Sequence, residues 1–174
     1  KLNEDIFLYA YDWRQPLDKQ SQSLKNYLEK IMKNKQEGTK IKFIGHSFGG
    51  LVIRSYLTDF PDDERVENVV TVGTPHEGMV FAYPLWEKGE IWSDDKLFKI
   101  TLTQLINHCR IIRLPINFQT ARKVVQSLVP SVKSLLPLFD FLQRDNNTLP
   151  TAGLNEQNDW LKNHESIPAN FLGS

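Results

Sequence analysis

The stretch 41–50 constrains the fold of this chain more than any other part of the sequence. An apolar run at 41–44 has the character of a buried strand, and Gly-His-Ser-Phe-Gly follows at once at 45–49. The apolar positions within 51–57 then have the spacing of a packed helix. A strand that passes directly into a helix through a glycine-bounded turn predicts a sharp and strained backbone at the residue between them, which is Ser47.

The same turn predicts a chemical role for Ser47. We expect that positions 45 and 49 require glycine, because strand and helix approach each other too closely there for a Cβ atom. The turn lifts the serine hydroxyl above the sheet edge and places the backbone N–H of Phe48 where an oxyanion forms. Ser47 is therefore the predicted nucleophile and Phe48 the predicted oxyanion donor. The alternative is a glycine-rich turn with an ordinary serine.

Length and composition limit the classes of protein to consider. The chain has 174 residues, which fits one domain or part of one, and its 21 basic and 21 acidic residues cancel. No global field therefore attracts nucleic acid or an anionic membrane. The single cysteine, Cys109, excludes an internal disulfide. No His, Cys or Asp cluster has metal-ligand spacing and no phosphate loop is evident, so we predict no metal, no cofactor and no nucleic-acid partner.

Targeting signals are not evident in the sequence. It contains no run of about 18 apolar residues and no signal-peptide pattern. The chain opens at Lys1, close to a predicted strand. We therefore expect a piece of a longer protein, and the localisation stays open.

Strands and helices alternate over the first part of the chain. The apolar run at 6–11 predicts a strand buried on both faces. A polar segment through Ser23 leads into a helix whose apolar stripe covers 24–32, and a valine-rich run at 66–72 predicts a further strand. This alternation predicts a parallel sheet with right-handed crossovers. In it, the strands at 6–11 and 66–72 lie on either side of the strand at 41–44.

The character of the sequence changes beyond Gly78. Aromatic residues punctuate a loop-like segment at Phe81, Tyr83, Trp86 and Trp92. Helical spacing then predicts a helix over 98–112, a second over 118–128 and a short one that ends at Pro137. No further strand of β-branched residues is evident beyond this point.

These patterns divide the chain into three parts. Residues 1–79 are predicted to form the central part of an α/β core. Residues 80–164 are predicted to form a helical cap, and 165–174 the start of a segment that returns to the core.

Three segments together resemble the lecithin:cholesterol acyltransferase family of α/β-hydrolases. They are Tyr11-Asp12-Trp13-Arg14, Gly45-His46-Ser47-Phe48-Gly49-Gly50 and Val72-Gly73-Thr74-Pro75-His76-Glu77-Gly78. The stretches 131–137 and 158–161 also look like the cap of bacterial members. Glycine-bounded serine turns occur across the superfamily, whereas their combination with Asp-Trp-Arg is more specific. The resemblance implies a partial α/β-hydrolase fold, with parallel strands, a nucleophile elbow and a helical cap or lid.

The resemblance also implies a serine acyl-ester enzyme that acts on lipid esters, as a lipase, phospholipase or O-acyltransferase. Ser47 would form an acyl-enzyme, which water or an alcohol then releases. No residue of the sequence decides between these acceptors. The apolar cap would cover the acyl chain and could contact a membrane or lipid surface. The alternative for the cap is a helical subdomain that packs only its own core.

Candidate substrate-binding residues are Trp13, Arg14 and His46. The first two lie beyond the carboxyl end of a predicted strand, where ligands of parallel sheets bind. The alternative for Arg14 is an ion pair with Asp12 or with a carboxylate of the cap. An elbow turns His46 away from the nucleophile.

The remaining catalytic groups are not evident. In α/β-hydrolases the acid and then the histidine follow the serine on loops after later strands. His76, His108 and His164 do not follow such strands, so we interpret each as structural or solvated. The second oxyanion donor would precede Lys1. We therefore expect the acid and histidine outside this chain and predict that the chain alone is inactive.

Two other functions stay open. One is a non-catalytic module of the same fold that binds a lipid or a protein. The other is a minimal esterase whose triad is completed by His164 together with Asp140, Asp145 or Asp159.

Overall fold

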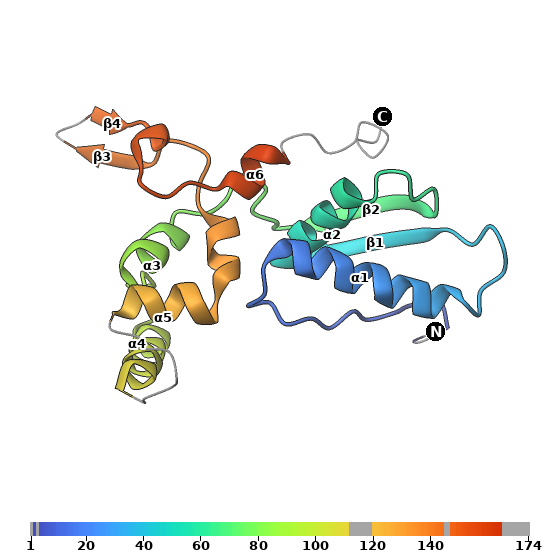
Figure 1. Ribbon diagram of the computed structural model, residues 1–174, viewed down its shortest axis with the longest axis horizontal. Coiled ribbons are helices and arrows are strands. Elements are labelled where there is room, and N and C mark those ends of the chain that lie inside the picture. The colour runs from blue at the N-terminus through green and yellow to red at the C-terminus, as the bar shows by residue number, and fades with distance from the viewer. Residues whose placement is uncertain (1, 3, 112–119, 145–146, 165–174) are drawn as a thin grey trace. The chain divides into compact units, whose positions relative to one another are not determined.

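The computed structural model describes residues 2, 4–111, 120–144 and 147–164 (Figure 1). The chain divides into two compact units. The first, called here the sheet unit, comprises Lys1–Thr74 and His164–Ser174. The second, called here the helical unit, comprises Pro75–Asn163.

The sheet unit is built on two parallel strands, β1 (Ile41–His46) and β2 (Val66–Val72). Phe43 pairs with Val69 and His46 with Val72, so the carboxyl ends of both strands lie at the same edge. The predicted strands at 41–44 and 66–72, and their parallel pairing, are confirmed. The mixture of helices with a parallel sheet is that of an α/β fold.

Helix α2 (Phe48–Asp59) packs against both strands, and α1 (Leu17–Met32) packs against α2 (Figure 1). Residues 51–57 are all buried, because α2 packs on both α1 and β1. The buried Ser55 hydroxyl donates to the Leu17 carbonyl at 3.1 Å, which joins the two helices. Helix α1 starts earlier than its apolar stripe predicted. Pro16 precedes it, and the polar Gln20 and Ser21 are buried within it.

The predicted strand at 6–11 was wrong. Residues 7–11 run without ladder pairing to β1 and alternate between half-buried and exposed side chains. Phe7, Tyr9 and Tyr11 are half-buried, while Leu8 is 73% exposed. The sequence has the alternation and composition of a strand, but a strand also needs a partner whose backbone accepts and donates its hydrogen bonds.

The helical unit is formed around a small apolar core. Its helices are α3 (Ala82–Lys88), α4 (Lys96–Ile111), α5 (Ala121–Leu128) and the 3₁₀-helix η1 (Pro130–Leu135). The core consists of Ala82, Trp86, Val125, Val132 and Leu136. The predicted loop was wrong at Tyr83 and Trp86, which lie on the short helix α3, whereas Phe81 precedes this helix and Trp92 follows it in irregular structure. That helix ends at Gly89, whose φ of 73° is the usual left-handed helix end.

The predicted helices of this unit are found at α4, α5 and η1. Positions 112 and 118, where the first was expected to end and the second to begin, lie outside the described residues. The expectation of no further strand was wrong. Two strands of three residues, β3 (Leu142–Arg144) and β4 (Asn147–Leu149), pair antiparallel. Strands this short are below the length at which alternation is recognisable. The 3₁₀-helix η2 (Thr151–Gly153) and helix α6 (Asp159–Asn163) follow.

Candidate active site

The turn between β1 and α2 carries Ser47 in a strained conformation. Its φ of 51° and ψ of −125° make it the one non-glycine residue with positive φ in the described part of the chain. Such a conformation persists only where surrounding structure fixes it. Here the Ser47 N–H donates to the Val72 carbonyl at 2.9 Å, and the Ser47 carbonyl accepts from the Gly50 N–H at 3.1 Å. The predicted strand–turn–helix geometry at Ser47 is confirmed.

The glycines around Ser47 differ in how much room each has for a side chain. A Cβ atom on Gly45 would lie 2.6 Å from Ile53 Cδ1 and 2.8 Å from Gly50 Cα, so this position has no room for a side chain. A Cβ atom on Gly49 would lie 3.5 Å from the Tyr11 hydroxyl, an ordinary contact. The prediction for Gly49 was therefore wrong. The close approach is at Gly50, where a Cβ atom would lie 2.7 Å from Thr74 Cγ2.

Phe48 is the first residue of α2. The first N–H groups of a helix have no acceptor within it and carry the positive end of the helix dipole. The backbone of Phe48 therefore starts an electropositive helix end directly after Ser47.

Tyr11 is a site residue that the sequence interpretation missed. Its ring centroid lies 6.3 Å from that of Phe48, and its hydroxyl faces Gly49. Burial, and secondarily the neighbouring Tyr9, raises the pKa of the Tyr11 hydroxyl. The signal for this residue was available in the alternation of 7–11, which puts Tyr11 on the same side as Phe7 and Tyr9.

Arg14 forms an ion pair with Asp12 two residues earlier. The guanidinium donates to the carboxylate from Nε at 2.8 Å and from Nη2 at 2.9 Å, and the Arg14 backbone N–H adds a bond of 3.2 Å. Hydrogen bonds from the Arg14 side chain are the main cause that lowers the pKa of Asp12 to about 2. Arg14 was interpreted either as a substrate-binding residue or as a member of an ion pair, and this geometry is that of an ion pair with Asp12. Trp13 between them is 58% exposed.

The histidines lie in different environments. His46 is exposed on β1, where its register partner is Val72. His76 is half-buried after β2, and His108 is exposed on α4. His164 follows α6, and its carbonyl accepts from Nε of the buried Arg54 on α2 at 3.1 Å.

Of the acids considered as partners of His164, Asp140 and Asp159 bind other groups of the helical unit. The Asp140 carboxylate accepts from the Thr151 N–H at 2.7 Å and from its hydroxyl at 2.8 Å. Asp159 pairs with Lys133 at 3.4 Å. Asp145 lies outside the described residues.

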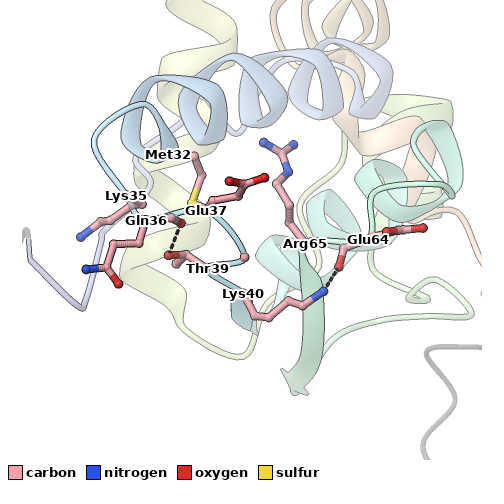
Figure 2. A pocket seen from close by; sticks show the side chains of 9 residues that line it. Met32, Lys35, Gln36, Glu37, Thr39, Lys40, Glu64 and Arg65 are labelled. Atoms are coloured by element: carbon pink, nitrogen blue, oxygen red, sulfur yellow. Dashed lines mark hydrogen bonds between the residues drawn. The ribbon is translucent and has the colours of Figure 1, made fainter.

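A pocket of about 340 Å³ lies at the other end of the sheet (Figure 2). Its lining comes from the end of α1, the loop 35–40 before β1, and Glu64 and Arg65 before β2. Lys40 Nζ donates to the Glu64 carbonyl at 2.7 Å across this region. Because ligands of open parallel sheets bind beyond the carboxyl ends of the strands, this pocket is on the wrong side for chemistry at Ser47.

The described residues contain neither a membrane-spanning helix nor a metal site. Within the described ranges, no helix has the length and apolar character needed to span a bilayer. The same ranges contain no group of three or more His, Cys, Asp or Glu side chains placed to hold a metal ion.

A serine on a strained turn between a parallel strand and a helix is the arrangement that α/β-hydrolases have at their nucleophile. A profile of the palmitoyl protein thioesterase family matches residues 10–127, which include β1, the Ser47 turn, α2 and β2. The chain belongs to the palmitoyl protein thioesterase family.

A curated relative is similar over a shorter range. The chain is 37% identical over 76 residues to the uncharacterized protein YJR098C of Saccharomyces cerevisiae. The match covers 43% of this chain and 11% of that protein. The chain therefore spans only a small part of this relative's length.

Proposed function

We propose that this chain carries the nucleophile of a serine hydrolase that cleaves long-chain acyl esters or thioesters through an acyl-enzyme on Ser47. The observation that carries the proposal is the positive φ of Ser47 at the carboxyl end of β1, directly before the first N–H groups of α2. A buried structural serine has no need of such a conformation, whereas a nucleophile gains exposure and an adjacent oxyanion donor from it.

The proposed reaction has two steps. A general base, expected outside this chain, takes the proton of the Ser47 hydroxyl as Oγ attacks the acyl carbonyl carbon. The carbonyl oxygen becomes an oxyanion that accepts from the Phe48 N–H. Collapse of this intermediate expels the alcohol or thiol, which takes the proton, and leaves the acyl group on Oγ. Water then attacks the acyl carbonyl carbon as the base takes one of its protons, and the base returns that proton to Ser47 Oγ as the bond between Oγ and the acyl group breaks and the fatty acid leaves.

The substrate class rests on two resemblances of unequal weight. The family match points to palmitoyl thioesters of proteins, as its name states. The Tyr-Asp-Trp-Arg segment at 11–14 resembles that of the lecithin:cholesterol acyltransferase family, in which an alcohol can accept the acyl group. Hydrolysis is the first proposal because it needs only water as acceptor. Lipase, phospholipase and O-acyltransferase activities are the alternatives for the same acyl-enzyme.

The helical unit is proposed to act as a cap that holds the acyl chain. Phe81 and Trp92 are 58% and 51% exposed, and large exposed aromatic side chains are suited to cover an apolar ligand. A cap with this role also excludes water from the acyl-enzyme until hydrolysis.

The proposal is tested by turnover of acyl thioesters and esters of matched chain lengths by the full-length protein. Ser47→Ala is expected to lower kcat by several orders of magnitude, while Ser127→Ala, at an exposed position on α5, retains activity. Phe81→Ala with Trp92→Ala is expected to lower kcat/KM for a sixteen-carbon acyl group about tenfold more than for a four-carbon group. Full turnover by Ser47→Ala would contradict the proposal. Equal losses at both chain lengths would contradict only the role of the cap.

A further inference from the structure

The Tyr11 side chain contacts the start of α2, and the proposed reaction gives it no role. A Cβ atom on Gly49 would lie 3.5 Å from the Tyr11 hydroxyl oxygen, and the Tyr11 ring centroid lies 6.3 Å from that of Phe48. Phe48 and Gly49 are the first two residues of α2. The Tyr11 hydroxyl therefore lies beside the same helix end that supplies the Phe48 N–H, directly after Ser47.

Contacts with α1 hold Tyr11 in place. The Tyr9 ring stacks on the Tyr11 ring with centroids 5.7 Å apart, and Tyr9 in turn lies 5.1 Å from the ring of Tyr27 on α1. Directly after Tyr11, the Asp12 carbonyl accepts a hydrogen bond from the side-chain amide of Gln20, which is buried on α1. A side chain that is already fixed in this way loses little conformational freedom when it binds a ligand.

The Tyr11 hydroxyl can donate a hydrogen bond to a ligand. In the described part of the chain it has no hydrogen-bond partner. Burial, and secondarily the neighbouring Tyr9, raises the pKa of this hydroxyl, so it keeps its proton at neutral pH. The hydroxyl of Tyr27, in the same row of rings, already donates to the Leu8 carbonyl at 3.1 Å. The two hydroxyls therefore differ, because that of Tyr27 is engaged and that of Tyr11 is available.

We propose that the Tyr11 hydroxyl donates a hydrogen bond to the oxyanion that forms when Ser47 attacks an acyl carbonyl. This role rests on the proposed function, because the oxyanion arises only if Ser47 is the nucleophile. An oxyanion bound by the Phe48 N–H lies at the start of α2, where the Tyr11 hydroxyl also lies. Tyrosine O–H groups serve as oxyanion donors alongside backbone N–H groups. Tyr11 keeps its proton throughout, and its hydrogen bond strengthens as negative charge develops on the carbonyl oxygen.

The first test is the turnover of a sixteen-carbon acyl thioester by the full-length protein and by Tyr11→Phe, which keeps the ring and removes only the hydroxyl. We expect kcat to fall about 100-fold and KM to stay unchanged, because the lost hydrogen bond belongs to the transition state. The control is Tyr27→Phe, which removes a hydroxyl from the same row of rings and is expected to retain kcat. Thermal unfolding of Tyr11→Phe should match that of the parent protein.

The second test uses a trifluoromethyl ketone with a sixteen-carbon chain, which forms an oxyanion without turnover. Its carbonyl carbon bonds to Ser47 Oγ as the general base takes the hydroxyl proton, and its carbonyl oxygen becomes the oxyanion. Tyr11→Phe is expected to weaken inhibition by this ketone about 100-fold. In the Ser47→Ala background no oxyanion forms. There the dissociation constant of the sixteen-carbon thioester should be the same with and without Tyr11→Phe.

Other outcomes would overturn this role of Tyr11. Full turnover by Ser47→Ala contradicts the proposed function and the oxyanion with it. If Ser47→Ala is inactive, then full kcat in Tyr11→Phe, or an equal loss in Tyr27→Phe, excludes Tyr11 alone and leaves the proposed function intact. A rise in KM with unchanged kcat, or weaker thioester binding in the Ser47→Ala background, assigns Tyr11 to the wall of the acyl site. A lower melting temperature with unchanged inhibition by the ketone assigns it to packing.

Discussion

The Ser47 N–H donates a 2.9 Å hydrogen bond to the Val72 carbonyl, so the turn that carries Ser47 continues the pairing of β1 with β2. This bond fixes the residue after His46 at the end of a parallel ladder. The strained φ of Ser47 is therefore imposed by the sheet on one side and by the first turn of α2 on the other. A strained backbone of this kind lowers the stability of the folded protein.

Replacement of Ser47 by glycine is expected to stabilise the protein and to abolish its activity. Glycine adopts a positive φ without a Cβ clash, and relief of strain of about 1–3 kcal/mol exceeds the extra chain entropy of glycine, about 0.5–1 kcal/mol. Ser47→Ala keeps the Cβ atom and serves as the control. Chemical denaturation should give a higher free energy of unfolding for the glycine variant. A glycine variant no more stable than the alanine variant would show that the turn is not strained.

Gly50→Ala and Gly49→Ala are expected to have opposite effects on stability. A methyl group on Gly50 would collide with the side chain of Thr74, and overpacking of this kind costs about 1–3 kcal/mol. Gly49 has room for a methyl group within α2, where alanine favours the helix by about 0.5–1 kcal/mol. The two unfolding free energies, measured on the same protein, check this. A similar loss in both variants would contradict the assignment of the close approach to Gly50.

The difference between these glycines shows where sequence interpretation ends. The Gly-x-Ser-x-Gly pattern predicted the turn and the position of Ser47, because a strand, a glycine pair and a helix follow each other along the chain. Which glycine lacks room depends on Thr74, which comes from the next turn and meets Gly50 only after β1 and β2 have paired. Tyr11 reaches Phe48 through the same kind of contact between distant residues.

The runs at 6–11 and 66–72 were both predicted as strands, and only the second forms one. The run at 66–72 was found with the expected bounds because α2 places it beside β1. The run at 6–11 has an equally apolar composition but no ladder partner among the described residues. Composition and alternation describe one strand, whereas a sheet needs two strands in register. The strands β3 and β4 were not predicted because each has only three residues. The start of α1 was not predicted because the first turns of this helix carry polar residues.

Asp63 is expected to link stability to pH. Its carboxylate accepts from Arg65 Nε at 2.6 Å and from the hydroxyl of the buried Tyr56. Burial acts to raise the pKa of Asp63, but the hydrogen bonds from Arg65 and Tyr56 outweigh it and lower the pKa from 3.8 to about 2. The unfolded chain therefore takes up the proton first as the pH falls, and stability from Asp63 is present above about pH 4 and lost towards pH 2.

Asp63→Asn is accordingly expected to lower the free energy of unfolding by about 1.5–3 kcal/mol at neutral pH, the range for hydrogen bonds to a charged group. The difference from the parent protein should shrink as the pH falls from about 4 to 2. Asp62→Asn, in the same loop and exposed, is the control and should show no such trend. A difference for Asp63→Asn that stays constant over this range would contradict the role of its charge.

Arg14 and Asp12 are expected to act as one unit. Because the guanidinium already gives two hydrogen bonds to the carboxylate, Arg14→Ala and Asp12→Asn should have similar effects on turnover, and the double variant should be no worse than either. KM and kcat for an acyl ester, measured for all three variants, check this. A rise in KM confined to Arg14→Ala would instead make Arg14 a substrate-binding residue.

The most direct measurement for the central claim is peptide mapping of the full-length protein after reaction with a fluorophosphonate, which traps activated serines. We expect one major adduct, on the peptide that contains Ser47, and its loss in Ser47→Ala but not in Ser127→Ala. Prior incubation with a long-chain acyl thioester should slow the labelling, because the acyl group occupies the same oxygen. An adduct on another serine, or labelling that persists in Ser47→Ala, would show that the strained turn does not carry the nucleophile.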